Sequence, residues 1–162
     1  MPAKKIVFPT DFSHCSDAAL AYATMLARAL DASLLIVHAE EPAVAYGGGE
    51  MYYGMLEPDH EELQKMLKEI KPTDPTVPYE HRLLSGKSAP AKLIVEFAKN
   101  EQAELIVLGT HGRTGLKRVL MGSIAESIIR HASCPVLVMK QTDDPRRLKT
   151  QKETDVAPTD KQ

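Results

Sequence analysis

Cysteine is scarce in this chain of 162 residues, which contains only Cys15 and Cys134. The two lie far apart and fit neither a metal site nor a redox motif, which favours two ordinary thiols. With 43% hydrophobic residues, the chain can bury a sizeable core without disulfide bonds. The sequence therefore predicts one globular domain with no need of covalent staples.

The chain also lacks an excess of charge of either sign, since it contains 20 Lys and Arg residues and 22 Asp and Glu residues. Such a balance creates no strong field that would gather nucleic acid or anionic lipid. No apolar run approaches the length needed to cross a bilayer, and residues 1–5 lead directly into a predicted strand rather than a signal-peptide core. We expect a cytoplasmic protein with no nucleic-acid partner and no membrane insertion.

Four short apolar runs, at residues 6–8, 34–37, 105–108 and 136–139, lack the alternation of a half-exposed strand. Strands that are apolar on both sides are typical of a parallel sheet with two covered faces. A fifth candidate, residues 77–84, is more polar and contains Pro78, which suits an edge strand.

Helical patterns separate these strands, with apolar residues repeating every three or four positions. The residues expected on buried helix faces are Ala18, Tyr22, Met25, Leu26 and Ala29; Leu63, Met66, Leu67 and Ile70; Leu93, Ile94, Phe97 and Ala98; and Ile124, Ala125, Ile128, Ile129 and Ala132. Because strand and helix alternate throughout, the chain is predicted to form a doubly wound α/β domain with right-handed crossovers.

Capping and turn-forming residues indicate where the helices start and which segments lie outside the core. Ser13, Asp59 and Ser88 are expected to open the first three helices, and the pattern from Ser123 to Glu126 is that of a capping box. Residues 41–55 are rich in glycine and tyrosine and are expected to form a long mobile loop. We expect the domain to span residues 1–141 and residues 142–162 to form a disordered tail.

The most informative segment runs from residue 105 to residue 140, where a strand leads through a glycine-rich loop into a helix. Gly109, Gly112 and Gly122 are separated by two and then nine residues, and Ser123 follows directly. Glycine has no Cβ, so backbone amides at these positions can approach a ligand closely. The helix that starts near Ser123 would direct its unpaired N–H groups at the same space, which favours an anion such as phosphate.

Several better-known motifs fail on inspection. Gly86-Lys87-Ser88 follows a strand and precedes a helix, but His81 stands where the first glycine of a Walker A motif belongs. The segment 109–115 has two residues between its first glycines and so fails the dinucleotide fingerprint. The sequence contains no nucleophile elbow, and His60-Glu61-Glu62 lacks the second histidine of a zinc helix.

Three segments together resemble the universal stress protein superfamily, in its ATP-binding branch. They are Pro9-Thr10-Asp11-Phe12-Ser13, the spaced Gly109, Gly112, Gly122 and Ser123, and Cys134-Pro135-Val136-Leu137-Val138-Met139. The resemblance covers residues 4–140. It implies a five-stranded parallel sheet in the order 3-2-1-4-5 with helices on both faces, the adenine nucleotide alpha hydrolase-like arrangement. It also implies nucleotide binding where the strand order reverses, as open α/β sheets do in general.

The resemblance also assigns site residues by position. Asp11 matches an acidic residue at the ribose, with Pro9 and Thr10 on the adenine side. Ala39 matches a residue whose backbone meets the adenine edge, although the family usually has a larger aliphatic side chain there. The phosphate loop and the turn that closes it match Gly109, Thr110, His111, Gly112, Arg113, Gly122, Ser123 and Ile124. ATP is the implied ligand, and Mg²⁺ is a candidate companion held chiefly by phosphate oxygens.

Each assignment has a structural alternative. Asp11 could orient the turn or cap the first helix, Ser123 could act only as a helix cap, and Gly109 could simply end a strand. His111 is assigned contact rather than catalysis, and His38 is expected to be a satisfied core histidine. The Arg113 guanidinium would add charged hydrogen bonds to phosphate.

We favour a regulatory module in stress adaptation, in which ATP occupancy changes contacts with a second copy or with a protein partner that the sequence does not identify. One alternative is a slow ATP hydrolase or phosphotransferase, for which the sequence offers no Walker lysine and no evident base. Another is a partner-binding subunit with a vestigial pocket. The enzyme question stays open, with at most weak ATPase activity expected.

An apolar strand at a sheet edge invites pairing with another chain. The last strand is expected to lie at such an edge, and the family commonly associates through it. The resemblance therefore implies a homodimer through Pro135, Val136, Leu137, Val138 and Met139.

Overall fold

The computed structural model describes residues 3–42, 59–110 and 121–140. Within them the chain forms β1 (Lys4–Pro9), α1 (His14–Leu30), β2 (Ala32–Ala39), α2 (His60–Glu69), β3 (Tyr79–Leu84), α3 (Pro90–Asn100), β4 (Leu105–Gly109), α4 (Ser123–His131) and β5 (Val136–Met139). Most of the predicted loop 41–55 and the whole predicted tail 142–162 lie outside the described residues.

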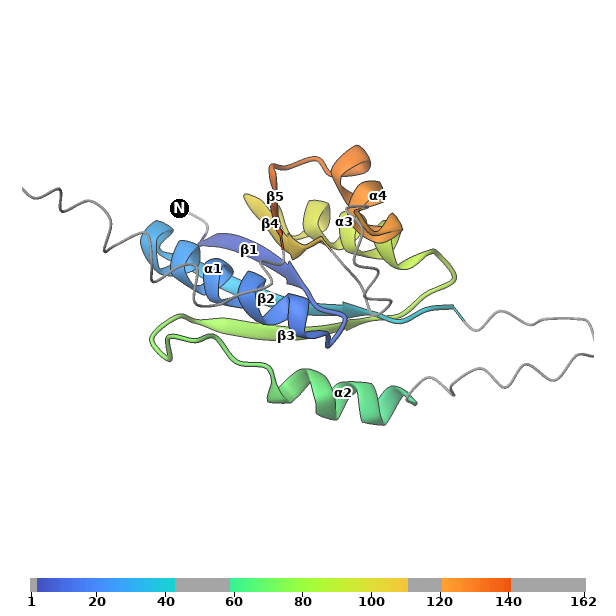
Figure 1. The fold of residues 1–162 in the computed structure, drawn as a ribbon, viewed down its shortest axis with the longest axis horizontal. Coiled ribbons are helices and arrows are strands. Elements are labelled where there is room, and N and C mark those ends of the chain that lie inside the picture. Colours follow the sequence, from blue (N-terminus) through green and yellow to red (C-terminus); the bar gives the residue numbers. More distant parts are fainter. Residues whose placement is uncertain (1–2, 43–58, 111–120, 141–162) are drawn as a thin grey trace, which may run out of the picture.

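The five strands form one parallel sheet in the order β3-β2-β1-β4-β5, which confirms the predicted α/β topology. Figure 1 shows α3 and α4 together on one side of this sheet, with α2 on the other side. β3 lies at one edge, as its polar residues and Pro78 predicted, and β5 lies at the other. The order reverses at β1, because the chain moves first toward β2 and later returns to β4.

Two hydrophobic clusters fill the two faces of the sheet, and β1 contributes to both. Ile6 and Phe8 pack in the cluster under α1 and α2, whereas Val7 packs in the cluster under α3 and α4. All three side chains are completely buried. The alternation follows from the two-residue period of a strand, and it explains why the run is apolar without interruption.

The buried face of α1 differs from the predicted one. The prediction chose the stripe that contains Ala18, Met25 and Ala29, but these residues are exposed, Met25 by 54%. The stripe that packs on the sheet consists of Ala19, Leu20, Ala23, Thr24 and Ala27. Small side chains let the helix lie close to the sheet, and the hydroxyl of Thr24 donates to the carbonyl oxygen of Leu20 at 2.8 Å, which removes the cost of burying it.

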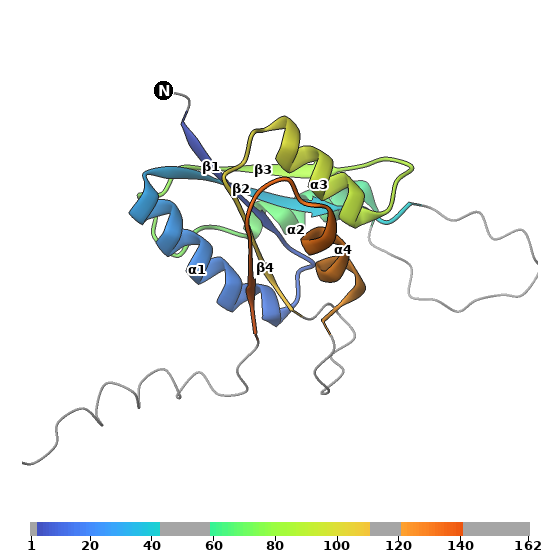
Figure 2. The same ribbon diagram turned by 90° about the horizontal axis from the view of Figure 1, so that it is seen from above.

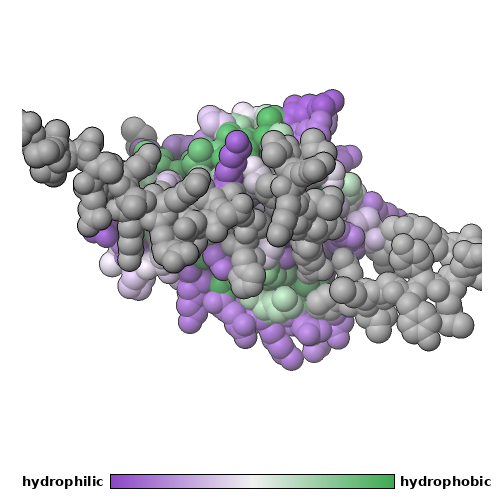
Figure 3. All heavy atoms as spheres, viewed as in Figure 1, coloured by the Kyte–Doolittle hydropathy of each residue, from purple (hydrophilic) through white to green (hydrophobic). Residues whose placement is uncertain are grey.

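The other helices follow the predicted faces more closely. α2 buries Leu63 and Leu67 and leaves its charged side facing outward, where Figure 3 shows a hydrophilic margin along the lower side of the molecule. α3 buries Ile94 and Ala98 as predicted. α4 buries Ala125 and Ile128, whereas the predicted core residues Ile124 and Ile129 are more than 40% exposed.

The observed buried face of α1 predicts that alanine substitutions on its two stripes change the free energy of unfolding by different amounts. Leu20→Ala removes a side chain that is 9% exposed and should lower the free energy of unfolding by about 2–4 kcal/mol. Met25→Ala, on the opposite stripe, should change it by less than about 1 kcal/mol. Urea denaturation of both variants measures the difference, and equal losses would contradict the helix orientation described here.

Candidate functional site

The carboxyl ends of β1, β2 and β4 meet at one edge of the sheet, at the point where the strand order reverses. The β1–β2 register pairs Pro9 with Val37, and the N–H of Thr10 donates to the Val37 carbonyl oxygen at 2.8 Å. The β1–β4 register pairs Val7 with Ile106 and, continued along both strands, sets Thr10 level with Gly109. Figure 2 shows β1 and β4 side by side, with α1 and α4 on opposite sides of them.

Asp11 anchors the turn that leads from β1 into α1. Its Oδ1 accepts hydrogen bonds from the Ser13 N–H at 2.9 Å, from the Ser13 hydroxyl, and from the Ser16 hydroxyl at 3.0 Å. Within the described residues no hydrogen bond uses its second oxygen, Oδ2. Asp11 therefore orients the turn through Oδ1, as the structural alternative predicted. Its Oδ2 can still accept hydrogen bonds.

The turn contains a residue in a strained conformation. Phe12 has φ of 63°, in the left-handed region that a bulky non-glycine residue rarely occupies. Its N–H donates to Oγ1 of Thr10 at 3.0 Å, and its ring lies 4.5 Å from the ring of His38, measured between centroids. These contacts, together with those of Asp11, hold the strained residue in place.

His38 supports the same turn from β2. Its Nδ1 lies 2.8 Å from the carbonyl oxygen of Thr10, and because a carbonyl only accepts, Nδ1 carries the hydrogen. His38 is half-buried and satisfied, as predicted. Ala39, which follows it, has a side chain only 8% exposed in the core under α3 and α4, so a ligand contact there would be made by the main chain.

The loop between β4 and α4 is closed at its base by backbone hydrogen bonds. The N–H of Thr110 donates to the Met139 carbonyl oxygen at 3.0 Å, and the N–H of Gly122 donates to the Thr110 carbonyl oxygen at 2.9 Å. Gly109 and Gly122 thus stand on either side of one narrow neck. His111, Gly112 and Arg113 lie outside the described residues.

The predicted capping box at α4 is wrong. The N-cap residue is Gly122, whose carbonyl oxygen accepts from the Glu126 N–H at 3.0 Å, and Ser123 is already the first helical residue. The Glu126 carboxylate instead pairs with Arg130, one turn further on. Within the described residues no side chain caps the helix, so the N–H groups of Ser123 and Ile124 can serve as donors at its positive end.

Sequence reasoning missed the residues that support Asp11. Ser16 and His38 hold the turn but lie outside the segments that carry the family resemblance, and Phe12 lies inside one of them without having been assigned a role. The spacing of Asp11 and Ser13 could have indicated the turn, because an aspartate commonly accepts a hydrogen bond from the N–H two residues later. Nothing in the sequence indicates that His38 would meet Thr10, since that contact depends on the strand register.

A second polar cluster lies beside Ala39. Glu40 accepts a hydrogen bond from the Ser85 hydroxyl, and its Oε1 lies 2.8 Å from Nδ1 of His60. Burial opposes its ionisation, but the hydrogen bonds from Ser85 and His60 and the nearby imidazole charges outweigh it, so the pKa of the Glu40 carboxyl is lowered. The cluster ties the start of α2 to the ends of β2 and β3.

The described residues contain no group of three or more His, Cys, Asp and Glu side chains that could hold a metal ion. In the same part of the chain, no helix combines the length and the apolar character that crossing a bilayer requires. The thiol of Cys134 is half-buried, and this burial raises its pKa.

Comparison with known proteins identifies the family. The universal stress protein family matches residues 2–140. The chain belongs to this family. It is 40% identical over 143 residues to the universal stress protein MJ0531 of Methanocaldococcus jannaschii, an alignment that covers 85% of this chain and 82% of the relative.

Solved structures agree with this assignment. The structure of MJ0577 has a TM-score of 0.65 and 27% identity, and the match covers 89% of this chain and all of that one. A universal stress protein in complex with cAMP has a TM-score of 0.55 and 28% identity, covering 84% of this chain and 95% of that one.

The lowered pKa of Glu40 predicts a contribution to acid sensitivity. A carboxyl whose pKa is lower in the folded state stabilises the fold above its unfolded pKa of about 4.3, and loses that contribution as pH falls through the folded value. The free energy of unfolding of the native protein should therefore fall more steeply between about pH 5 and pH 3 than that of Glu40→Gln. Ser85→Ala should give an intermediate slope; identical slopes for all three would refute the assignment.

Proposed function

We propose that this universal stress protein binds an adenine nucleotide, with ATP as the principal ligand, at the carboxyl ends of β1, β2 and β4. The proposal rests chiefly on Asp11, whose Oδ1 is held by three donors, while no hydrogen bond within the described residues uses Oδ2, which can accept from ribose hydroxyls. A rigidly held carboxylate with one open oxygen binds a diol at little cost in side-chain entropy. The relative in complex with cAMP supports an adenine nucleotide as the ligand class.

The phosphates would lie at the neck between Gly109 and Gly122. The uncapped N-terminus of α4 supplies N–H donors and a positive dipole end there. Ser123 is exposed, and its hydroxyl is not engaged in a capping hydrogen bond, so it can contact phosphate. His111, Gly112 and Arg113 are proposed to complete the phosphate site, and Mg²⁺, when present, would be held mainly by phosphate oxygens.

Binding is proposed to serve regulation in the cytoplasm, through contacts that differ between the nucleotide-bound and nucleotide-free states. A ligand shifts such an equilibrium only by its differential affinity for the two states. The loop from 111 to 120 joins the proposed phosphate site to α4, and the Thr110 N–H joins the same loop to β5. Nucleotide bound at the phosphate site would thus affect the contacts of the edge strand β5.

Asp11→Asn tests the ribose assignment. An asparagine keeps an oxygen for Ser13 and Ser16 but replaces the accepting Oδ2 by an amide that only donates. Affinity for ATP and for adenosine should fall about tenfold or more, because a charge-assisted hydrogen bond is lost. Isothermal calorimetry measures both ligands, and Asp31→Asn at the end of α1 serves as the matched control. Undiminished affinity in Asp11→Asn would remove the ribose role.

Measuring ATP hydrolysis distinguishes a regulatory binding protein from a slow ATP hydrolase. The purified protein is denatured and any released nucleotide is identified by mass spectrometry; phosphate release is then followed with ATP and Mg²⁺. Stoichiometric nucleotide without sustained phosphate release supports a binding module. Sustained release that Asp11→Asn abolishes supports the enzyme, and a protein that cannot be loaded supports the vestigial pocket.

A homodimer through β5 is proposed from the geometry of this edge strand. Pro135 and Met139 direct carbonyl oxygens at β4, accepting from Ile106 and Thr110. By the two-residue period of a strand, Val136 and Val138 direct their N–H and C=O groups outward, where an edge can pair with a second copy.

Val138→Pro tests this pairing without breaking the ladder to β4. Proline removes only an outward N–H, so a folded monomer is expected where the native protein is a dimer. Sedimentation equilibrium measures the association, and Val138→Thr, which keeps the N–H, should remain dimeric. A native monomer, or a dimer unaffected by the proline, would refute pairing through β5.

A further inference from the structure

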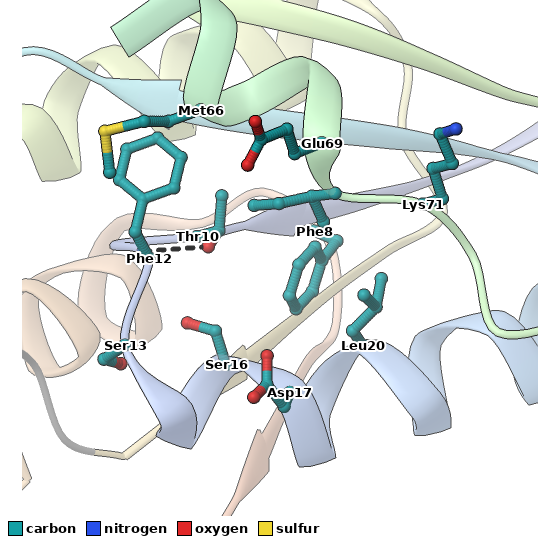
Figure 4. A pocket seen from close by; sticks show the side chains of 11 residues that line it. Phe8, Thr10, Phe12, Ser13, Ser16, Asp17, Leu20, Met66, Glu69 and Lys71 are labelled. Atoms are coloured by element: carbon teal, nitrogen blue, oxygen red, sulfur yellow. Dashed lines mark hydrogen bonds between the residues drawn. The ribbon is translucent and has the colours of Figure 1, made fainter. Parts of the chain in front are cut away.

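A cavity of about 420 Å³ lies between α1 and α2, over β1. Its volume falls within the range of roughly 300–1,000 Å³ that small-molecule pockets occupy. Phe8 and Thr10 form its floor, Leu20 lines the α1 side, and Met66 and Ile70 line the α2 side. Figure 4 shows Phe8, Thr10, Leu20 and Met66 around one space.

The interior of the cavity suits a flat or slender apolar group. Phe8 is completely buried and Leu20 is 9% exposed, so they lie beneath the pocket, and its accessible apolar surface comes from the partly exposed Phe12, Met66 and Ile70. Phe12 and Met66 lie next to each other at one end (Figure 4). A thioether beside an aromatic ring adapts its shape to aromatic or aliphatic partners.

The polar groups around this interior favour a positive charge. The carboxylates of Asp17 on α1 and Glu69 on α2 come from opposite walls (Figure 4). Ser16 also belongs to the lining, but its hydroxyl donates to Asp11. Lys71 belongs to the lining, but its ammonium group points away from both carboxylates. Within the described part of the chain no ion pair joins Lys71 to Glu69.

We propose that this cavity binds a small amphipathic organic cation, an amine or guanidine attached to an aromatic or short aliphatic body. The apolar body would lie on Phe12, Met66 and Ile70, and the cationic group would reach the carboxylates of Asp17 and Glu69. Both carboxylates are exposed at the rim, so the cation is only partly desolvated when bound.

This site is distinct from the proposed nucleotide site. Thr10 is shared, but its side chain faces the α1–α2 side of the sheet, whereas Val7, Ala39 and Leu108 face the other. Two rim carboxylates would repel a triphosphate. The two proposals can therefore fail independently.

Phenethylamine tests the proposal against two probes of similar shape, neutral 2-phenylethanol and anionic 3-phenylpropanoate. Titration into the ¹⁵N-labelled full-length protein should shift amide resonances of Leu20, Met66 and Ile70. The amine should bind about tenfold more tightly than the alcohol, since it gains charge-assisted hydrogen bonds, and the anion should bind more weakly still. Added salt should weaken amine binding and leave the alcohol unchanged.

Glu69→Gln should reduce the affinity for the amine about three- to fivefold, the size expected for an exposed ion pair, and leave the alcohol unaffected. Glu61→Gln, an exposed carboxylate on α2 that does not line the cavity, is the matched control. Asp17→Asn gives a second, independent reduction. Ser13 and Ser16 are left intact because their hydroxyls hold Asp11.

Four outcomes would overturn the proposal. They are no binding of phenethylamine at millimolar concentration, equal affinity for the three probes, resonance shifts outside the cavity, and an amine affinity that Glu69→Gln leaves unchanged. ATP supplies a further test: shifts that persist with saturating ATP support a separate site, and full competition refutes it. Loss of ATP binding in Asp11→Asn with retained amine binding would confirm that the two sites are independent.

Discussion

The structure depends on the central position of β1. This strand pairs with a neighbour on each side and is buried on both faces, so Ile6, Val7 and Phe8 are inaccessible to solvent. Because β2 and β4 extend the sheet in opposite directions from β1, the two following connections leave an opening at its carboxyl end. After Pro9 the chain makes one more backbone hydrogen bond to β2, from the Thr10 N–H to the Val37 carbonyl oxygen, before it turns into α1. The turn is held by side chains, with Asp11 bonded to Ser13 and Ser16, and His38 bonded to the Thr10 carbonyl.

Strain at Phe12 is consistent with this arrangement. A residue with φ of 63° stores conformational energy that the surrounding contacts must offset. The offset comes from several separate groups: the Thr10 hydroxyl, the His38 ring and the Asp11 carboxylate. What this tight turn achieves is a fixed direction for the open oxygen of Asp11. Preorganisation of this kind lowers the entropic cost of ligand binding, which is why it concentrates at functional sites.

The sequence predicted the architecture well because uninterrupted apolar strands have few alternative placements. It failed where two patterns fit equally. On α1, the stripes through Met25 and through Leu20 both repeat every three or four residues, and hydrophobicity favoured the one with larger side chains. Close approach of the helix to the sheet favoured alanines instead, and the Thr24 hydroxyl found an acceptor inside its own helix. At α4, Ser123 and Glu126 have the spacing of a capping box, which would make Ser123 the N-cap. The N-cap is instead Gly122, one residue earlier, whose N–H donates to the Thr110 carbonyl oxygen. Long-range backbone contacts of this kind leave no local signal. For the same reason the α1–α2 cavity was not predicted, since its walls come from three elements that are distant in sequence.

The two proposed sites share one structural element, the first turn of α1. Ser13 and Ser16 line the cavity between α1 and α2, and both donate their hydroxyl groups to the oxygen of Asp11 that fixes its orientation. A cation that draws either serine toward the cavity would weaken that anchor, and a ribose bound to Asp11 would strengthen it. Because coupling between two binding equilibria is reciprocal, any effect of the cation on nucleotide affinity must appear with equal size as an effect of the nucleotide on cation affinity. The hydrogen bonds at stake are short-range and partly exposed, so the coupling is limited to a fraction of the free energy of those bonds. Two distinct sites can therefore be occupied together, with at most this weak coupling between them through the first turn of α1.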